Sequence, residues 1–150
     1  MSTTVRPGQL AAWRAILTAQ AELTERIDHA LRDGGAIPLH WYDALLGLHE
    51  APERRLRLGE LARTALLSRS GLSRLVDRLE EAGLLRREAC GDDARGAFAV
   101  LTPAGLAALR KAWRIYEREI QRLFGQHVTG REATAISAAL GRVLEASQKP

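Results

Sequence analysis

The chain has 150 residues, of which 46% are hydrophobic and 27% are charged, a balance typical of a globular protein and not of a disordered one. Its net charge of +4 suits a polyanionic partner but does not require one. The single cysteine, Cys90, excludes an internal disulfide framework. Residues 1–13 lack the apolar core of a signal peptide, and no window reaches the ~18 apolar residues of a membrane span. We therefore expect a soluble, cytoplasmic protein with no membrane partner.

Short breaker sequences divide the first half of the chain into helices and one very short strand. The predicted elements are helices over 8–33, 38–50 and 59–64, and a one-bond strand around Arg57. Apolar residues recur at helical spacing in the first of these, and Gly34-Gly35 is a suitable end for it. Ala51-Pro52 closes the second helix.

The second half of the chain adds a helix, a hairpin and two more helices. Ser68 is a suitable N-cap for the fourth helix, and Gly83 stands where a left-handed C-terminal cap belongs. Residues 84–101 change to a strand-like pattern around the turn Gly-Asp-Asp-Ala-Arg-Gly. Thr102-Pro103 opens a long helix to residue 128, and a Thr129-x-x-Glu132 capping box opens the last helix. The predicted fold class is mainly α with a small β-hairpin wing, a winged helix-turn-helix between helical arms.

The fourth helix, within SRSGLSRLVDRLEEAGLLRR at residues 68–87, is chemically asymmetric. One face is apolar and is expected to be buried; its members are Leu72, Leu75, Val76 and Leu79. The opposite face begins with small and basic residues, namely Ser70, Ser73 and Arg74. Glu80 and Glu81 would repel DNA if the helix lay flat on it, but not if only the first two turns entered a groove. The alternative is an ordinary amphipathic helix with i,i+3 pairs such as Arg74 with Asp77.

The hairpin supplies a second basic feature. Arg86, Arg87 and Arg95 are expected to lie in or beside a turn that has little apolar material to bury and therefore projects into solvent. A protruding basic loop next to a groove-reading helix is suited to the minor groove. Asp93 is placed to accept a hydrogen bond from Arg95 and hold it extended. The alternative is an ordinary solvated turn.

Residues 56–105, LRLGELARTALLSRSGLSRLVDRLEEAGLLRREACGDDARGAFAVLTPAG, resemble the core of the MarR family of winged helix-turn-helix regulators. The shared motifs are the ELA helix, the recognition helix, the Cys-x-x-Asp-x-Arg-Gly wing and the LTPAG helix start. The resemblance implies one chain over 1–150, with dimerisation helices at 8–35 and 103–147 and a DNA-binding lobe at 37–102. It further implies a homodimer on a pseudo-palindromic operator of double-stranded DNA, with half-sites about 10 base pairs apart.

The resemblance assigns DNA contacts to the recognition helix and the wing, at Ser68, Arg69, Ser70, Ser73, Arg74, Asp93 and Arg95. Arg78 and Arg86 are weaker candidates for contacts to the DNA backbone. A transcriptional repressor is expected more than an activator, because a protein in the groove of a promoter blocks polymerase. Two alternatives are a sequence-independent chromosome-associated DNA-binding protein and a winged-helix protein-interaction module. The second of these is disfavoured because the basic and small residues are retained.

Members of this family often respond to small aromatic or phenolic anions bound between the dimer helices and the DNA-binding lobe. The candidate ligand-binding residues are Trp13, His40, Trp41 and Asp43. Packing in the core or in the dimer interface is the favoured alternative for the tryptophans. Trp113 and Tyr116 are expected to be packing residues.

An enzyme is not expected, because the sequence has no Walker loop, nucleophile elbow or dinucleotide-binding GxGxxG. Its four histidines lie on three predicted helices without ligand spacing, so neither a metal nor a cofactor is expected, although histidines from two subunits can meet. Cys90 lies in the wing and is interpreted as a structural thiol and not as a redox sensor.

Overall fold

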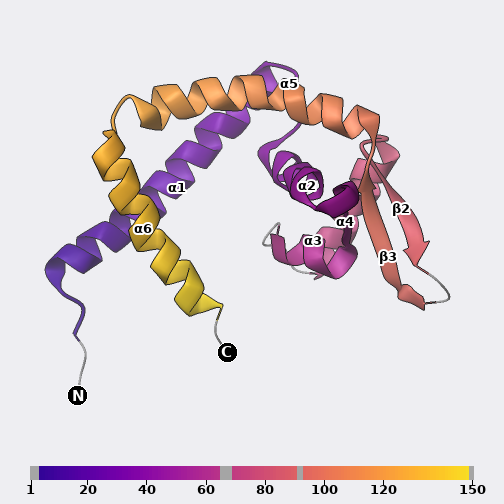
Figure 1. The fold of residues 1–150 in the computed structure, drawn as a ribbon. Helices are drawn as coiled ribbons and strands as arrows, with labels where there is room; N and C mark the ends of the chain where they lie inside the picture. Colours follow the sequence, from indigo (N-terminus) through magenta and orange to yellow (C-terminus); the bar gives the residue numbers. More distant parts are fainter. Residues whose placement is uncertain (1–3, 65–68, 91–92, 149–150) are drawn as a thin grey trace. The chain divides into compact units, whose positions relative to one another are not determined.

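The computed structural model describes residues 4–64, 69–90 and 93–148 and divides the chain into two compact units, Met1–Tyr116 and Glu117–Pro150 (Figure 1). The described elements, in chain order, are α1 (Pro7–Asp33), α2 (Leu39–Glu50), a 3-10 turn (Pro52–Arg54), β1 (Arg55–Arg57), α3 (Leu58–Thr64), α4 (Arg69–Glu81), β2 (Leu85–Cys90), β3 (Asp93–Leu101), α5 (Pro103–Ile120), a π-helical turn (Gln121–Gly125) and α6 (Gly130–Ser147). This order confirms the predicted fold class, mainly helical with a small antiparallel sheet.

The sheet has three antiparallel strands in the order β1-β3-β2. Arg57 of β1 and Glu88 of β2 lie opposite Phe98 of β3, one on each side. The strand predicted around Arg57 is real but longer than a single bridge, since all three residues of β1 pair with β3. Because side chains alternate between the two faces of a sheet, Arg57, Phe98 and Glu88 share one face.

Glycines end two helices in the predicted manner. Gly35 has a φ of 63°, and the N–H of Ala36 donates to the carbonyl of Leu31 at the end of α1. Gly83 has a φ of 76°, and the N–H of Leu84 donates to the carbonyl of Leu79 at the end of α4. The left-handed cap predicted at Gly83 is therefore confirmed. The predicted N-cap of α4, Ser68, lies outside the described residues.

Threonine side chains begin the two last helices. The hydroxyl of Thr102 accepts a hydrogen bond from the N–H of Gly105 and donates one to the carbonyl of Gly83. At Thr129 the reciprocal bonds with Glu132 form the predicted capping box. Thr102 thus joins the start of α5 to the end of α4.

The long helix predicted over residues 103–128 is interrupted. The α-helical part ends at Ile120, and a π-helical turn follows over Gln121–Gly125. The N–H of Gln126 donates to the carbonyl of Gln121, five residues earlier. The prediction of one continuous helix was wrong here. A π-turn adds one residue to the ring that each backbone hydrogen bond closes, and the apolar pattern on which the prediction depended does not reveal this change.

The core of the first unit lies among α1, α2, α3, α4, the sheet and the first part of α5. Its most completely buried large side chains are Leu31, Leu45, Leu48, Leu61, Val76, Leu79 and Leu85. The predicted apolar face of α4 is confirmed, because its four members are all buried. Gly105 marks a close approach: a Cβ added there would lie 2.0 Å from the carbonyl oxygen of Leu84. The start of α5 therefore runs directly against the turn between α4 and β2.

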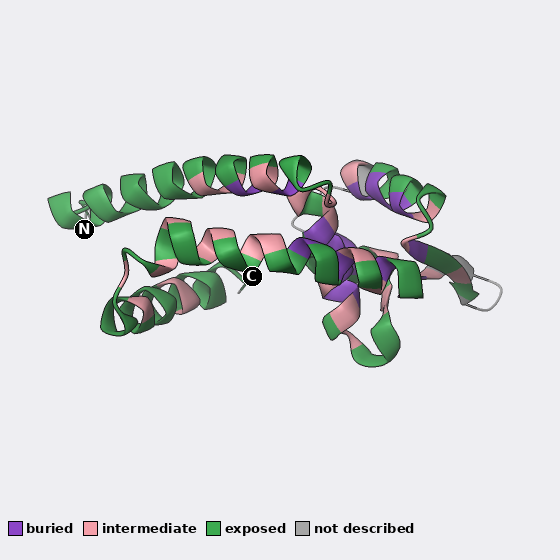
Figure 2. Ribbon diagram, turned by 90° about the horizontal axis from the view of Figure 1, so that it is seen from above, coloured by how far each residue is buried: buried purple, intermediate pink, exposed green. Residues whose placement is uncertain are grey.

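Two helices have little or no core of their own. Only Ile27 and Leu31 of α1 are buried, and residues 4–22 are exposed throughout, as the continuous green of its first part shows (Figure 2). In the second unit, α6 has no buried residue, and Val143 and Leu144 are 56% and 62% exposed.

Candidate functional site

The exposed face of α4 carries the described part of the predicted recognition surface. Ser73, Arg74 and Arg78 are exposed. Arg69 and Ser70 form the first turn of the helix, but their side chains lie outside the described part of the structure.

Two of the three acidic residues of α4, Asp77 and Glu80, are directed toward β2. Glu80 accepts a hydrogen bond from the Arg87 guanidinium at 2.9 Å and another from the Arg87 backbone N–H at 2.8 Å. Asp77 binds the other end of the same guanidinium, and this hydrogen bond is the main cause that raises the pKa of Arg87 above its usual value. The i,i+3 pair of Arg74 with Asp77, which the alternative interpretation predicted, is absent among the described side chains, where Asp77 pairs with β2 instead. We call this group of Asp77, Glu80 and Arg87 the α4–β2 clamp.

The arginines at the start of β2 do not lie where the sequence suggested. Arg86 and Arg87 pair with Val100 and Ala99 at the base of the hairpin. The expectation that both lie in or beside the projecting turn is therefore wrong, because β2 extends over Leu85–Cys90 and places both arginines opposite the end of β3 that is far from the turn. Asp93 and Arg95 belong to β3, and their side chains lie outside the described part.

The face of the sheet that carries Phe98 holds a second charge cluster. Arg55 pairs with Glu88 at 3.1 Å, and Arg86 pairs with the other oxygen of the same carboxylate. The guanidinium carbons of Arg55 and Arg57 lie 4.0 Å and 5.3 Å from the centre of the Phe98 ring. Sequence reasoning missed this cluster, because its members lie far apart along the chain.

These contacts separate two classes of arginine in the winged helix-turn-helix. Three are paired with described carboxylates, namely Arg55, Arg86 and Arg87. Five exposed ones form no ion pair with a described side chain, namely Arg54, Arg57, Arg63, Arg74 and Arg78. The arginines of the second class are exposed without a described counter-ion, whereas those of the first are held by carboxylates.

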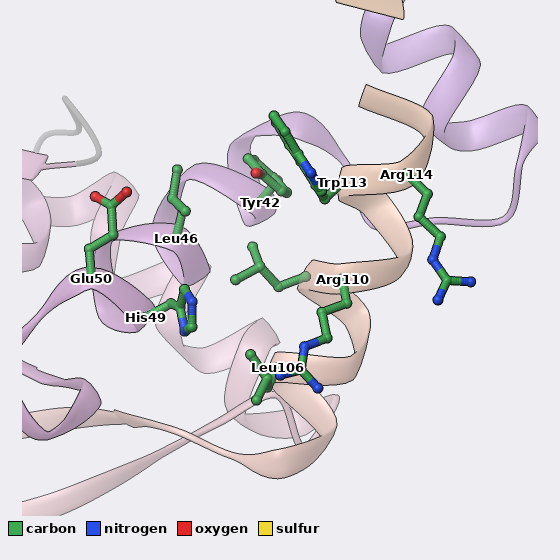
Figure 3. A pocket seen from close by; sticks show the side chains of 9 residues that line it. Tyr42, Leu46, His49, Glu50, Leu106, Arg110, Trp113 and Arg114 are labelled. Carbon is green, nitrogen blue, oxygen red and sulfur yellow. The ribbon is translucent and has the colours of Figure 1, made fainter. Parts of the chain in front are cut away.

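A cavity of about 510 Å³ lies between α2 and α5. Its lining consists of Tyr42, Leu46, His49, Glu50, Leu106, Leu109, Arg110, Trp113 and Arg114. In Figure 3 the side chains of Tyr42 and His49 face the α5 wall, whereas Arg114 points away from α2. The Nδ1 atom of His49 is buried without a hydrogen-bond partner among the described residues. The cavity thus combines an apolar wall, aromatic rings and an unsatisfied polar atom.

Aromatic packing closes one side of this cavity. Tyr42 meets Tyr116 edge to face at 5.2 Å, and Tyr116 meets Trp113 at 6.0 Å. Burial raises the pKa of both tyrosines. Tyr116 packs as expected, but Trp113, also expected to pack, is 42% exposed and lines the cavity.

The four predicted ligand-binding residues are not brought together. His40 and Asp43 line a smaller cavity of about 340 Å³ beside α1, where burial raises the pKa of Asp43 against the opposing effect of His40. Trp41 is half-buried and Trp13 is 57% exposed. Neither tryptophan belongs to the lining of either cavity.

Within residues 4–64, 69–90 and 93–148, no group of three or more histidine, cysteine, aspartate or glutamate side chains is placed to hold a metal ion. None of the described helices is long and apolar enough to cross a membrane.

Comparison with known proteins gives a consistent result. The model of the MarR family matches residues 37–96. AbsC, a MarR family transcriptional regulator from Streptomyces coelicolor, is 31% identical with a TM-score of 0.85, over 98% of this chain and 99% of that one. Sco3205, a MarR family transcriptional regulator from the same organism solved in complex with DNA, is 32% identical with a TM-score of 0.88, over 99% of this chain and 93% of that one. The chain therefore belongs to the MarR family of transcriptional regulators.

Proposed function

We propose that this protein is a sequence-specific DNA-binding regulator that acts as a homodimer on a pseudo-palindromic operator. The observation that carries the proposal is the division of charge on α4. Two of its three acids, Asp77 and Glu80, are bound to Arg87, and the third, Glu81, is its last residue. Arg74 and Arg78 are exposed with no described counter-ion. A helix with this division can enter a major groove by its N-terminal half, because its free carboxylate lies at the other end.

In this proposal the first two turns of α4 read base edges, through Ser68, Arg69, Ser70, Ser73 and Arg74. Arg78 contacts the DNA backbone, and the wing enters the minor groove through Asp93 and Arg95. Arg86 is the weakest of the predicted contacts, because it shares the Glu88 carboxylate with Arg55.

The exposed apolar residues of the two arm helices support a homodimer. On α1 these residues follow one helical stripe, Leu10, Trp13, Ile16 and Leu17, each at least 40% exposed. The α6 helix buries none of its own residues. A second copy of the chain supplies the missing cover, as in symmetric dimers in general.

Fluorescence anisotropy with the DNA upstream of the protein's own coding sequence, and with a scrambled duplex, tests the DNA-binding proposal. The native duplex should bind more tightly at two salt concentrations. Arg74→Ala should weaken specific binding by about 10-fold or more, since a good base contact is worth about 1–3 kcal/mol. Arg95→Ala should also weaken it without loss of fold. Equal binding of both duplexes, lost together with added salt, would leave only a non-specific basic protein.

Light scattering after size exclusion tests the dimer. The wild-type particle should have twice the 16.5 kDa mass of one chain. Leu17→Asp should lower that mass toward the monomer value, whereas Ala15→Asp, on the opposite side of α1, should not. A monomeric wild type would contradict the proposal.

The cavity between α2 and α5 supports a repressor that an aromatic or phenolic anion releases from DNA. Its wall is mainly apolar, Trp113 offers a ring face, and Arg110 brings a positive charge to the lining. Benzoate and 4-hydroxybenzoate should quench tryptophan fluorescence and release operator DNA. Arg110→Gln should abolish this response, and Arg118→Gln, which alters an arginine of α5 outside the cavity lining, should preserve it. A response that is the same in both variants would remove the cavity from the proposal.

A further inference from the structure

Two arginines on β1 occupy nearly equivalent positions but differ in charge environment. Arg55 and Arg57 are two residues apart, so both lie on the Phe98 face of the sheet. Both guanidinium groups lie over the Phe98 ring. Arg55 is paired with Glu88 at 3.1 Å. The Arg57 side chain is exposed and forms no ion pair with a described side chain.

One carboxylate does lie near Arg57 along the chain. Glu60 accepts a hydrogen bond from the backbone N–H of Arg57 at 3.2 Å, at the start of α3. That bond uses the main chain and leaves the guanidinium donors free. Arg57 therefore presents a positive charge to solvent. The contact of its guanidinium with the Phe98 ring restricts the positions that this charge can take.

The register places Arg57 on the side of the sheet nearer the hairpin turn. Arg55 lies opposite Val100 and Arg57 opposite Phe98, and β3 runs from the turn toward its base. Arg57 is therefore the end of β1 that is closer to the turn. Phe98 follows Arg95 by three residues, a distance of roughly 10 Å along an extended strand. The next residue, Leu58, begins α3, which packs against α4.

We propose that Arg57, which lies beside the wing and over the Phe98 ring, makes an additional contact to the DNA backbone. Arg55, on the same face of the sheet, has a structural role instead. The inference rests on the proposed DNA-binding function. An arginine with free donors between the wing and the helix-turn-helix matches the side chains that position a protein on phosphates without reading sequence. Arg55 differs because its guanidinium is already held by the Glu88 carboxylate.

The salt dependence of DNA binding tests the proposal, because each phosphate contact contributes a slope of about 0.9 to the plot of log affinity against log salt. Arg57→Gln should weaken binding to native and scrambled duplexes by the same factor. It should also reduce the slope by about 0.9 for each Arg57 that contacts DNA. Arg55→Gln is the matched control: its slope should equal that of the wild type, even if its melting temperature falls. Arg57→Lys, which keeps the charge, should restore the slope.

Three results would overturn the inference. They are a wild-type slope in Arg57→Gln, an equal loss of slope in Arg55→Gln, and a reduced slope in Arg57→Lys. A far-UV circular dichroism melt of each variant separates loss of fold from loss of contact. If the wild type itself fails to prefer the native duplex, the proposed function fails; if that preference stands while Arg57→Gln keeps the wild-type slope, only the present inference fails.

Discussion

Replacing Arg87 by glutamine removes the side chain that joins the proposed recognition helix to the wing strand. The substitution deletes the ion pairs with Glu80 and Asp77 but keeps the backbone N–H that donates to Glu80. The Arg87 side chain is 33% exposed and its partners are more so, so solvent screens the pairs. At about 0.2–1 kcal/mol for each exposed pair, plus a few tenths for the repulsion left between the two acids, the free energy of unfolding should fall by about 1–2 kcal/mol.

A double-mutant cycle isolates the pair itself. Urea unfolding of wild type, Arg87→Gln, Glu80→Gln and the double variant should give a coupling energy of about 0.5–1 kcal/mol. The unfolding is followed by far-UV circular dichroism at one fixed protein concentration, since dimerisation makes stability depend on concentration. Arg78→Gln is the control, because Arg78 lies on the same helix without a described partner; its effect should stay within about 0.5 kcal/mol. A coupling energy of zero, or an equal loss in the control, would refute the clamp.

Three other substitutions, one of them with a matched control, test packing and ionisation. Gly105→Ala should lower stability by about 1–3 kcal/mol, because its Cβ would overlap a backbone oxygen. The control Gly141→Ala, whose added Cβ would have no atom within 4 Å, should raise stability by about 0.5–1 kcal/mol. Equal melting temperatures of the two variants would contradict the close approach at Gly105. Leu75→Ala should cost about 2–5 kcal/mol, and an unchanged melt would contradict its burial. Burial raises the pKa of Asp43 above its usual 3.8. The folded protein therefore has its full stability below pH 3.8, where Asp43 is protonated in both the folded and the unfolded state. Stability is lost as the pH rises through the pKa of Asp43 in the folded state. Asp43→Asn should therefore raise the melting temperature at pH 7 but not at pH 3; an equal gain at both would contradict the burial effect.

Features decided by a few neighbouring residues could be predicted from the sequence. Gly83 ends α4 because a left-handed backbone suits a residue without Cβ, and Thr129 with Glu132 forms a reciprocal cap from side chains three residues apart. The apolar face of α4 followed from helical period alone. Such features need no knowledge of the rest of the fold.

Features that depend on distant residues could not be predicted. Arg55 and Glu88 are 33 residues apart and meet only because β1 and β2 flank the same strand. The cavity between α2 and α5 depends on the spacing of two helices, which local pattern does not encode. For the same reason no local pattern indicated that Trp113 would line that cavity. The wing contacts of Asp93 and Arg95 stay predictions, since their side chains lie outside the described residues.

The α4–β2 clamp and the close approach of α5 at Gly105 join α4, β2 and the start of α5 to one another. In the proposed homodimer, an effector that changes the distance and tilt between the two DNA-binding lobes can then leave these contacts within each lobe in place. Successive major grooves on one face of B-DNA repeat every ~10 base pairs. A shift of the lobes would keep one recognition helix in its major groove and move the other out of register with the next groove. The dimer would then leave the operator because the spacing of its two recognition helices no longer matches the groove repeat, while every helix stays folded.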